Sequence, residues 1–292
     1  MPHTSRPKRP TVQKRTQITD DEGWTHVASS GNVRRVMRSR PRATGTTAAI
    51  TKYSDSPAEL PIPPDDSSSN QSEPVLVPAE APGRLTLPEL QRQFQTHRER
   101  WESSESWRRL KAVLDERLER RMEDSSPETT SPIDAIICIG LGSPSGFLRD
   151  GWVDRRAVSL YQLAALASIN DRVASTTNKP PKVYAQDPVF NELDESLLAT
   201  LNIDILQHPA AFTHITSNTI LFSPGAERKH LELLLPSKPW LLFGGPLEHA
   251  DAGGVLQEYV DCAGSFCLPV FEGLEHAFWR MRLYWVEERE GR

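Results

Sequence analysis

Several features that would identify a common class of protein are missing from this 292-residue sequence. Its three cysteines include no C-x-x-C pair, so we expect neither a disulfide scaffold nor a structural zinc site. No apolar run approaches the roughly 18 residues of a membrane-spanning helix, so we expect no membrane association. The first residues have no apolar secretory signal. We therefore expect a cytoplasmic protein with access to the nucleus.

Familiar catalytic signatures are missing as well. Pro144 stands where a G-x-S-x-G nucleophile elbow would need its serine. The histidines form no H-x-x-x-H pair for a metal, so we predict no metal site. We assign no catalytic residue, and the sequence favours a protein that is not an enzyme. By ligand chemistry alone, His208 with Cys262 or Cys267 are candidate axial ligands for haem.

The net charge of −5 is unevenly distributed along the chain. Residues 1–43 carry +7, whereas residues 44–131 carry −5 and residues 132–292 carry −7. A basic arm suits protein partners and a nuclear import signal, and we expect no nucleic-acid binding because the acidic body repels phosphate. Within the arm, the candidate partner-binding residues are Trp24, Arg34 and Arg35. Trp24 is either a docking peptide that orders on binding or a chance aromatic residue.

Composition divides the chain into three parts. Residues 1–85 are expected to be a disordered arm and linker, because the stretch 40–84 is rich in proline and polar residues and cannot form a packed core. Residues 86–131 are expected to form a helical lead-in, with apolar residues spaced by three and four and a break at Ser103-Ser104. The heptads are too few for a coiled coil.

The sequence of residues 132–292 predicts alternating strands and helices. Short apolar runs predict strands at 133–139, 182–186, 203–206, 218–222, 240–243 and, as an edge strand, 266–270. Helical spacing predicts helices at 156–169, 192–201, 227–235 and 274–288. The expected fold is α/β, a Rossmann-like, doubly wound and mostly parallel sheet of about five or six strands with flanking helices.

In such a sheet a ligand binds beyond the carboxyl ends of the strands. The candidate ligand-binding residues are therefore Gly140, Gly142, Ser143, Gln162, Asp187, Pro224, Gly225, Gly244 and Gly245. Glycine turns let backbone N–H groups approach a phosphate or carboxylate, although tight turns alone also explain them. Asp187 either binds ribose hydroxyls or caps the following helix. The candidate cofactors are a nucleotide, S-adenosylmethionine or haem.

Several motifs together resemble the "sensitivity to red light reduced" (SRR1-like) domain family. They are Gly140-Leu141-Gly142-Ser143, Tyr161-Gln162-Leu163-Ala164, the segment 184–190, Leu221-Phe222-Ser223-Pro224-Gly225, the helix around Trp101 to Leu114 and a leader at 23–27. The resemblance covers about residues 86–285. It implies a regulatory protein of cytoplasm and nucleus, linked to light signalling and circadian rhythm in plants, and elsewhere to haem metabolism and cytoskeletal processes. It brings no reaction and no catalytic residues.

Three functional hypotheses follow from these observations. The first is a regulatory protein that binds a small ligand in its crevice and protein partners through its basic arm. The second is a nucleotide- or S-adenosylmethionine-dependent transferase, because the glycine loop and Asp187 lie at adjacent strand ends. The third is a pure interaction scaffold, in which Trp24 and the helical stretch 86–123 bind the partners.

Overall fold

The computed structural model describes the backbone of residues 15–19 and 25–29, and residues 77–123, 133–147, 155–177, 180–247 and 254–286 in full. The chain divides into two units, residues 1–70 and 71–292. In the first unit, β1 (Arg15–Thr19) and β2 (Thr25–Ser29) pair as an antiparallel hairpin. The partner-binding candidates Trp24, Arg34 and Arg35 lie outside the described residues.

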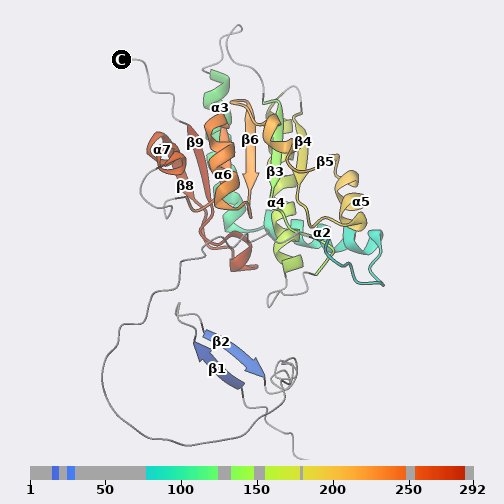
Figure 1. The fold of residues 1–292 in the computed structure, drawn as a ribbon. Coiled ribbons are helices and arrows are strands. Elements are labelled where there is room, and N and C mark those ends of the chain that lie inside the picture. Colours follow the sequence, from blue (N-terminus) through green and yellow to red (C-terminus); the bar gives the residue numbers. More distant parts are fainter. Residues whose placement is uncertain are drawn as a thin grey trace, which may run out of the picture. The chain divides into compact units, whose positions relative to one another are not determined.

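Seven strands of the second unit form one mixed sheet, in the order β5-β4-β3-β6-β7-β9-β8 (Figure 1). The strands are β3 (Ala135–Ile139), β4 (Lys182–Gln186), β5 (Ile203–Ile205), β6 (Thr219–Ser223), β7 (Leu241–Gly244), β8 (Ala263–Cys267) and β9 (Arg282–Val286). The pairs from β5 to β7 are parallel, whereas β9 runs antiparallel to both β7 and β8. The carboxyl ends of β4, β3 and β6 therefore meet at one edge of the sheet.

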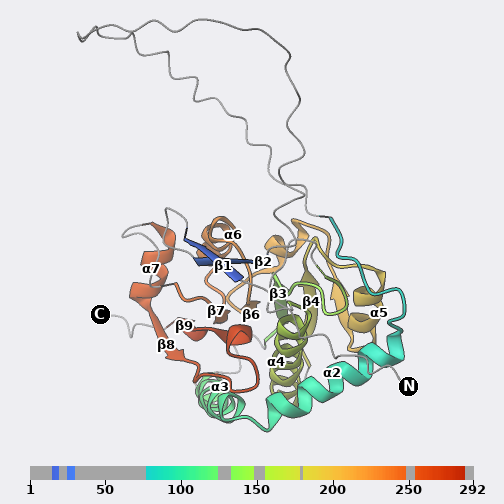
Figure 2. The ribbon, with the colours of Figure 1, turned by 90° about the horizontal axis from the view of Figure 1, so that it is seen from below.

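Helices cover both faces of the sheet (Figure 2). One face carries α2 (Leu87–Glu102), α3 (Glu105–Glu123), α4 (Arg155–Thr176) and α5 (Glu192–Thr200). The other carries α6 (Arg228–Leu234), α7 (Val255–Cys262) and the short 3-10 turns η1 (Ala210–His214) and η2 (Leu235–Ser237). None of the described helices is long and apolar enough to cross a membrane.

The inner strand β3 is buried on both faces, which explains its continuous apolar sequence. Ile136 and Cys138 pack into the core beneath α4, while Ile137 and Ile139 pack into the core beneath α6 and α7. The alternation follows from the two-residue period of a strand. Both cores therefore depend on β3, whose carboxyl end leads into the glycine loop.

Helices α2 and α3 form a layer that packs against α4, and α3 also reaches the sheet, where the Arg117 guanidinium lies 3.9 Å from the centroid of the Trp285 ring on β9. Trp101 at the end of α2 is completely buried, and its ring lies 4.5 Å from Phe278 and 5.5 Å from Phe271, centroid to centroid. Phe278 belongs to the short turn η3 (Glu275–Phe278), which precedes β9. Trp101 therefore joins the helical lead-in to the C-terminal part of the sheet domain.

The sequence prediction was wrong in the C-terminal part. Residues 274–288 form the turn η3 and strand β9 in place of the predicted helix. The spacing of Met281, Leu283 and Trp285 has a period of two, and Tyr284 between them faces the opposite core. Helix α7 was not predicted, and the edge strand β8 ends at Cys267, before Pro269. The sheet therefore has seven strands, not five or six.

The packing of Trp101 predicts a large effect of its removal. Trp101→Ala should lower the free energy of unfolding by about 3 to 5 kcal/mol, because a large buried side chain is replaced by a cavity. Trp279→Ala is the matched control, because Trp279 is 56% exposed, and should cost less than about 1 kcal/mol. Urea unfolding of both variants measures the difference. Equal costs would show that α2 is not docked on the sheet domain.

Candidate functional site

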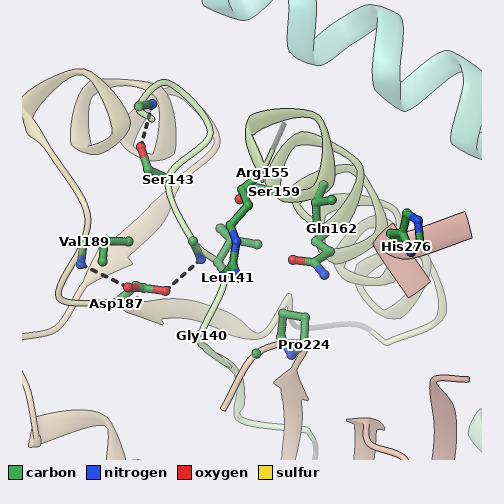
Figure 3. Close-up of a pocket in the computed structure, with 14 residues that line it drawn as sticks. Gly140, Leu141, Ser143, Arg155, Ser159, Gln162, Asp187, Val189, Pro224 and His276 are labelled. Atoms are coloured by element: carbon green, nitrogen blue, oxygen red, sulfur yellow. Dashed lines mark hydrogen bonds between the residues drawn. The ribbon is translucent and has the colours of Figure 1, made fainter. Parts of the chain in front are cut away.

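A pocket of about 500 Å³ lies at the carboxyl edge of the sheet, where the segments after β3, β4 and β6 meet (Figure 3). β3 and β6 are neighbours in the sheet, yet the chain leaves β3 for β4 on its other side. This is the switch point of the strand order, where open α/β sheets bind their ligands. The lining residues are Gly140, Leu141, Gly142, Ser143, Gly146, Arg155, Val158, Ser159, Gln162, Asp187, Val189, Pro224, Gly225 and His276.

The loop from Gly140 to Gly146 forms one wall of the pocket. Gly140 and Gly142 have φ values of 78° and 72°, a conformation that favours glycine. A Cβ atom on Gly140 would lie 2.5 Å from the carbonyl carbon of Gly225, so the loops after β3 and β6 touch backbone to backbone. A Cβ on Gly142 would lie 2.7 Å from Ser159 Oγ on α4. Glycine is therefore required here by the local fold itself.

Asp187 follows β4 directly and fixes this loop. Its Oδ2 accepts a hydrogen bond from the Gly142 N–H (2.7 Å), and its Oδ1 accepts one from the Val189 N–H (3.0 Å). Desolvation raises the pKa of Asp187; the two N–H donors oppose this rise, and the nearby Asp194 charge adds to it. Each carboxylate oxygen can accept more than one hydrogen bond, so Asp187 retains acceptor capacity towards the pocket that it lines.

Asp194 on α5 also binds the glycine loop through hydrogen bonds. It is fully buried, and its Oδ2 accepts from Ser143 Oγ (2.5 Å) while its Oδ1 accepts from the Ser145 N–H (2.8 Å). Its Oδ2 also accepts from the Asn191 N–H (3.2 Å), which closes the capping box of α5. Desolvation raises the pKa of Asp194, against these hydrogen bonds. Two partly or fully buried carboxylates therefore position the glycine loop.

The opposite wall comes from the first two turns of α4. Arg155, Val158, Ser159 and Gln162 lie on one face of the helix and line the pocket. The Arg155 side chain extends between the glycine loop and Pro224 (Figure 3). Gln162 donates through Nε2 to the carbonyl of Ala277 (2.8 Å), which fixes η3 and with it the neighbouring His276 at the pocket.

The structure brings seven of the nine sequence candidates together around this pocket: Gly140, Gly142, Ser143, Gln162, Asp187, Pro224 and Gly225. Gly244 ends β7 and Gly245 follows it, and neither residue lines this pocket. The physical reason is the strand order, because β6 separates β7 from the switch point beside β3.

The haem candidates are not brought together. His208 follows β5, and its Nδ1 lies 3.2 Å from Gln186 Nε2, whereas Cys262 and Cys267 end α7 and β8. β5 and β8 are the two outermost strands of the sheet. Among the described residues there is also no group of three or more His, Cys, Asp or Glu side chains placed to bind a metal ion.

Sequence reasoning missed Arg155, Ser159 and His276. Arg155 and Ser159 share the pocket-facing side of α4, but a helix buried on all sides has no polar stripe to reveal which face that is. His276 reaches the pocket only because η3 packs on α4. The one available signal was the position of Arg155 at the start of the helix after the glycine loop.

One comparison with known protein families gives a match, and it covers most of the second unit described above. The family model of the SRR1 domain matches residues 91–285, which run from α2 to β9. The match therefore includes the helical lead-in as well as the sheet and all residues that line the pocket. Neither the search of curated proteins nor the search of solved structures found a match.

Burial of Asp194 predicts a pH dependence of stability. A raised folded-state pKa means that the folded protein binds the proton more tightly, so the stabilising contribution is full at low pH. As pH rises above about 3.9, the pKa of Asp in an unfolded chain, this contribution is lost. The unfolding free energy of the wild type relative to Asp194→Asn should therefore fall as pH rises through this window.

The variant should also be less stable than the wild type by about 2 to 4 kcal/mol at neutral pH, because the Ser145 and Asn191 N–H groups lose a charged acceptor. Asp204→Asn, which removes an exposed carboxylate from β5, controls for the lost charge. Urea titrations at several pH values measure both effects. A wild-type advantage that grows with pH would contradict the stated effect of burial.

Proposed function

This chain belongs to the SRR1 domain family, and we propose that its pocket binds a ribose-bearing ligand, a nucleoside or a nucleoside-derived cofactor. The observation that carries the proposal is Asp187, an acceptor at the carboxyl end of β4 that lines the pocket at the switch point. Ribose hydroxyls are donors, and an acidic residue at this place binds them in dinucleotide-binding sheets.

The strand order supports this proposal and a Rossmann-like interpretation of the sheet. Numbered along the chain from β3, the strands β5-β4-β3-β6-β7 are the third, second, first, fourth and fifth. The same order begins the dinucleotide-binding fold, in which a glycine turn follows the first strand and an acidic residue follows the second. Here the glycine loop follows β3 and Asp187 follows β4. The pocket volume of about 500 Å³ is also within the usual range for small ligands.

In a regulatory role, a ligand bound in this pocket would control the binding of protein partners by the basic arm. We propose that a ligand-dependent signal reaches protein partners through Trp24, Arg34 and Arg35, in the cytoplasm and nucleus. The processes suggested by the family resemblance, including circadian regulation, are candidates for that signal. Deletion of residues 1–43 separates the two parts, because it should remove partner binding and leave the pocket intact.

The test is ligand-induced stabilisation of the full chain. Thermal unfolding is measured with adenosine, S-adenosylmethionine, NAD, ATP and haem, each over a concentration series. A ligand at one hundred times its Kd should add about 2.7 kcal/mol to the stability, a shift of several degrees. We expect at least one nucleoside compound to stabilise the protein and haem to have no effect.

Two phenylalanine variants locate the binding. Val158→Phe places a ring on the pocket-facing side of α4 and should abolish the shift. Val270→Phe, at a residue that is 67% exposed and does not line the pocket, should leave the shift unchanged. Substitution of Asp187 is less informative, because Asp187 also fixes Gly142. A response to haem alone, or to no compound, would overturn the proposal and favour the scaffold hypothesis.

A further inference from the structure

The chemistry of the two pocket walls narrows the class of nucleoside, an inference that rests on the proposed function. One wall contains the glycine loop with Asp187, and Asp194 lies behind it. The other wall contains the exposed guanidinium of Arg155 on the first turn of α4. A ligand that spans both walls meets hydrogen-bond acceptors at one end and a cation at the other.

The glycine loop is poorly suited to a phosphate chain. The N–H groups of Gly142, Ser145 and Gly146 already donate to Asp187, Asp194 and Ser143 Oγ. Pro144 has no N–H group at all. Loops that bind phosphate use free backbone N–H groups and avoid negative charge behind them. Here the Asp187 carboxylate lines the pocket beside the loop and the Asp194 carboxylate lies behind it, and both would repel the phosphates of NAD or ATP.

Arg155 provides a complementary site for a carboxylate. An arginine guanidinium presents planar N–H donors that match the geometry of a carboxylate. Arg155 lies at the N-terminus of a 22-residue helix whose first turn contains no acidic residue, so the helix dipole also favours a negative group there. A ligand with one carboxylate and an otherwise neutral or positive body suits both walls of the pocket.

The geometry points to a nucleoside whose 5′ substituent ends in an amino-acid carboxylate and carries no phosphate, the chemistry of S-adenosylmethionine and S-adenosylhomocysteine. Arg155 binds the carboxylate, and Asp187 accepts hydrogen bonds from the ribose hydroxyls. The glycine loop packs against the middle of the ligand, where a phosphate-free chain requires no free N–H donors. The positive sulfonium of S-adenosylmethionine is compatible with the carboxylates behind that loop.

Two ligands that differ only in the amino-acid chain test this assignment. Calorimetry measures the Kd of S-adenosylhomocysteine and of 5′-methylthioadenosine, which lacks the carboxylate, on the full-length protein. S-adenosylhomocysteine should bind about tenfold more tightly to the wild type, from one charge-assisted contact. Arg155→Ala should remove this difference while leaving 5′-methylthioadenosine within about twofold of its wild-type Kd. Arg155→Lys, which keeps the charge, should restore part of it.

Arg100→Ala is the matched control, because it removes an exposed arginine from α2, at a residue that does not line the pocket. It should preserve the preference for S-adenosylhomocysteine. Equal affinity of the wild type for both compounds, or an Arg155→Ala variant that weakens both equally, would overturn the carboxylate assignment and leave nucleoside binding standing. Tighter binding of NAD or ATP would also overturn it. Absence of binding by all of these nucleosides would overturn the proposed function as well.

Discussion

The loop between Gly140 and Gly146 contains no helix or strand, so its shape depends on the groups that bind its backbone. Asp187 fixes Gly142, Asp194 fixes Ser143 and Ser145, and the backbone of Gly225 lies against Gly140. These contacts come from the loop after β4, from α5 and from the loop after β6. The pocket is the space that remains between this loop and α4, so its form depends on the partly buried Asp187 and the fully buried Asp194.

The same carboxylates also underlie the ligand class that we propose for the pocket. Placing ionised groups out of water is unfavourable, and here N–H and O–H donors of the loop compensate for that cost. The compensation uses the backbone donors that a phosphate would otherwise need. In our proposal, the hydrogen bonds that stabilise the loop are thus also the reason that the site disfavours polyphosphates. On the other wall, Arg155 and the N-terminal end of α4 provide the positive electrostatic potential.

Strand ends were the most predictable part of the site. Short apolar runs located β3, β4 and β6, and parallel strands place their carboxyl ends at one edge, so Gly140, Asp187 and Gly225 were expected together. The helix phase that brings Arg155 to the pocket depends on long-range packing of α4 and has no local signal. Strand β9 could have been predicted from the sequence, because Leu283 and Trp285 alternate with Tyr284. The predicted helix over residues 274–288 included these residues, so their period of two was overlooked.

The layer formed by α2 and α3 explains why the pocket-facing end of α4 is well defined. Ser168 on α4 donates to Glu102 at the end of α2 (2.9 Å), and Arg172 on α4 pairs with Asp115 on α3. With the sheet on its other side, α4 is enclosed, so neither its rotation nor its position along its axis can change without breaking these contacts. The orientation of its first turn, and therefore of Arg155, is set partly by helices that do not line the pocket. The family match begins at residue 91, within α2, and so takes in most of this layer together with the sheet.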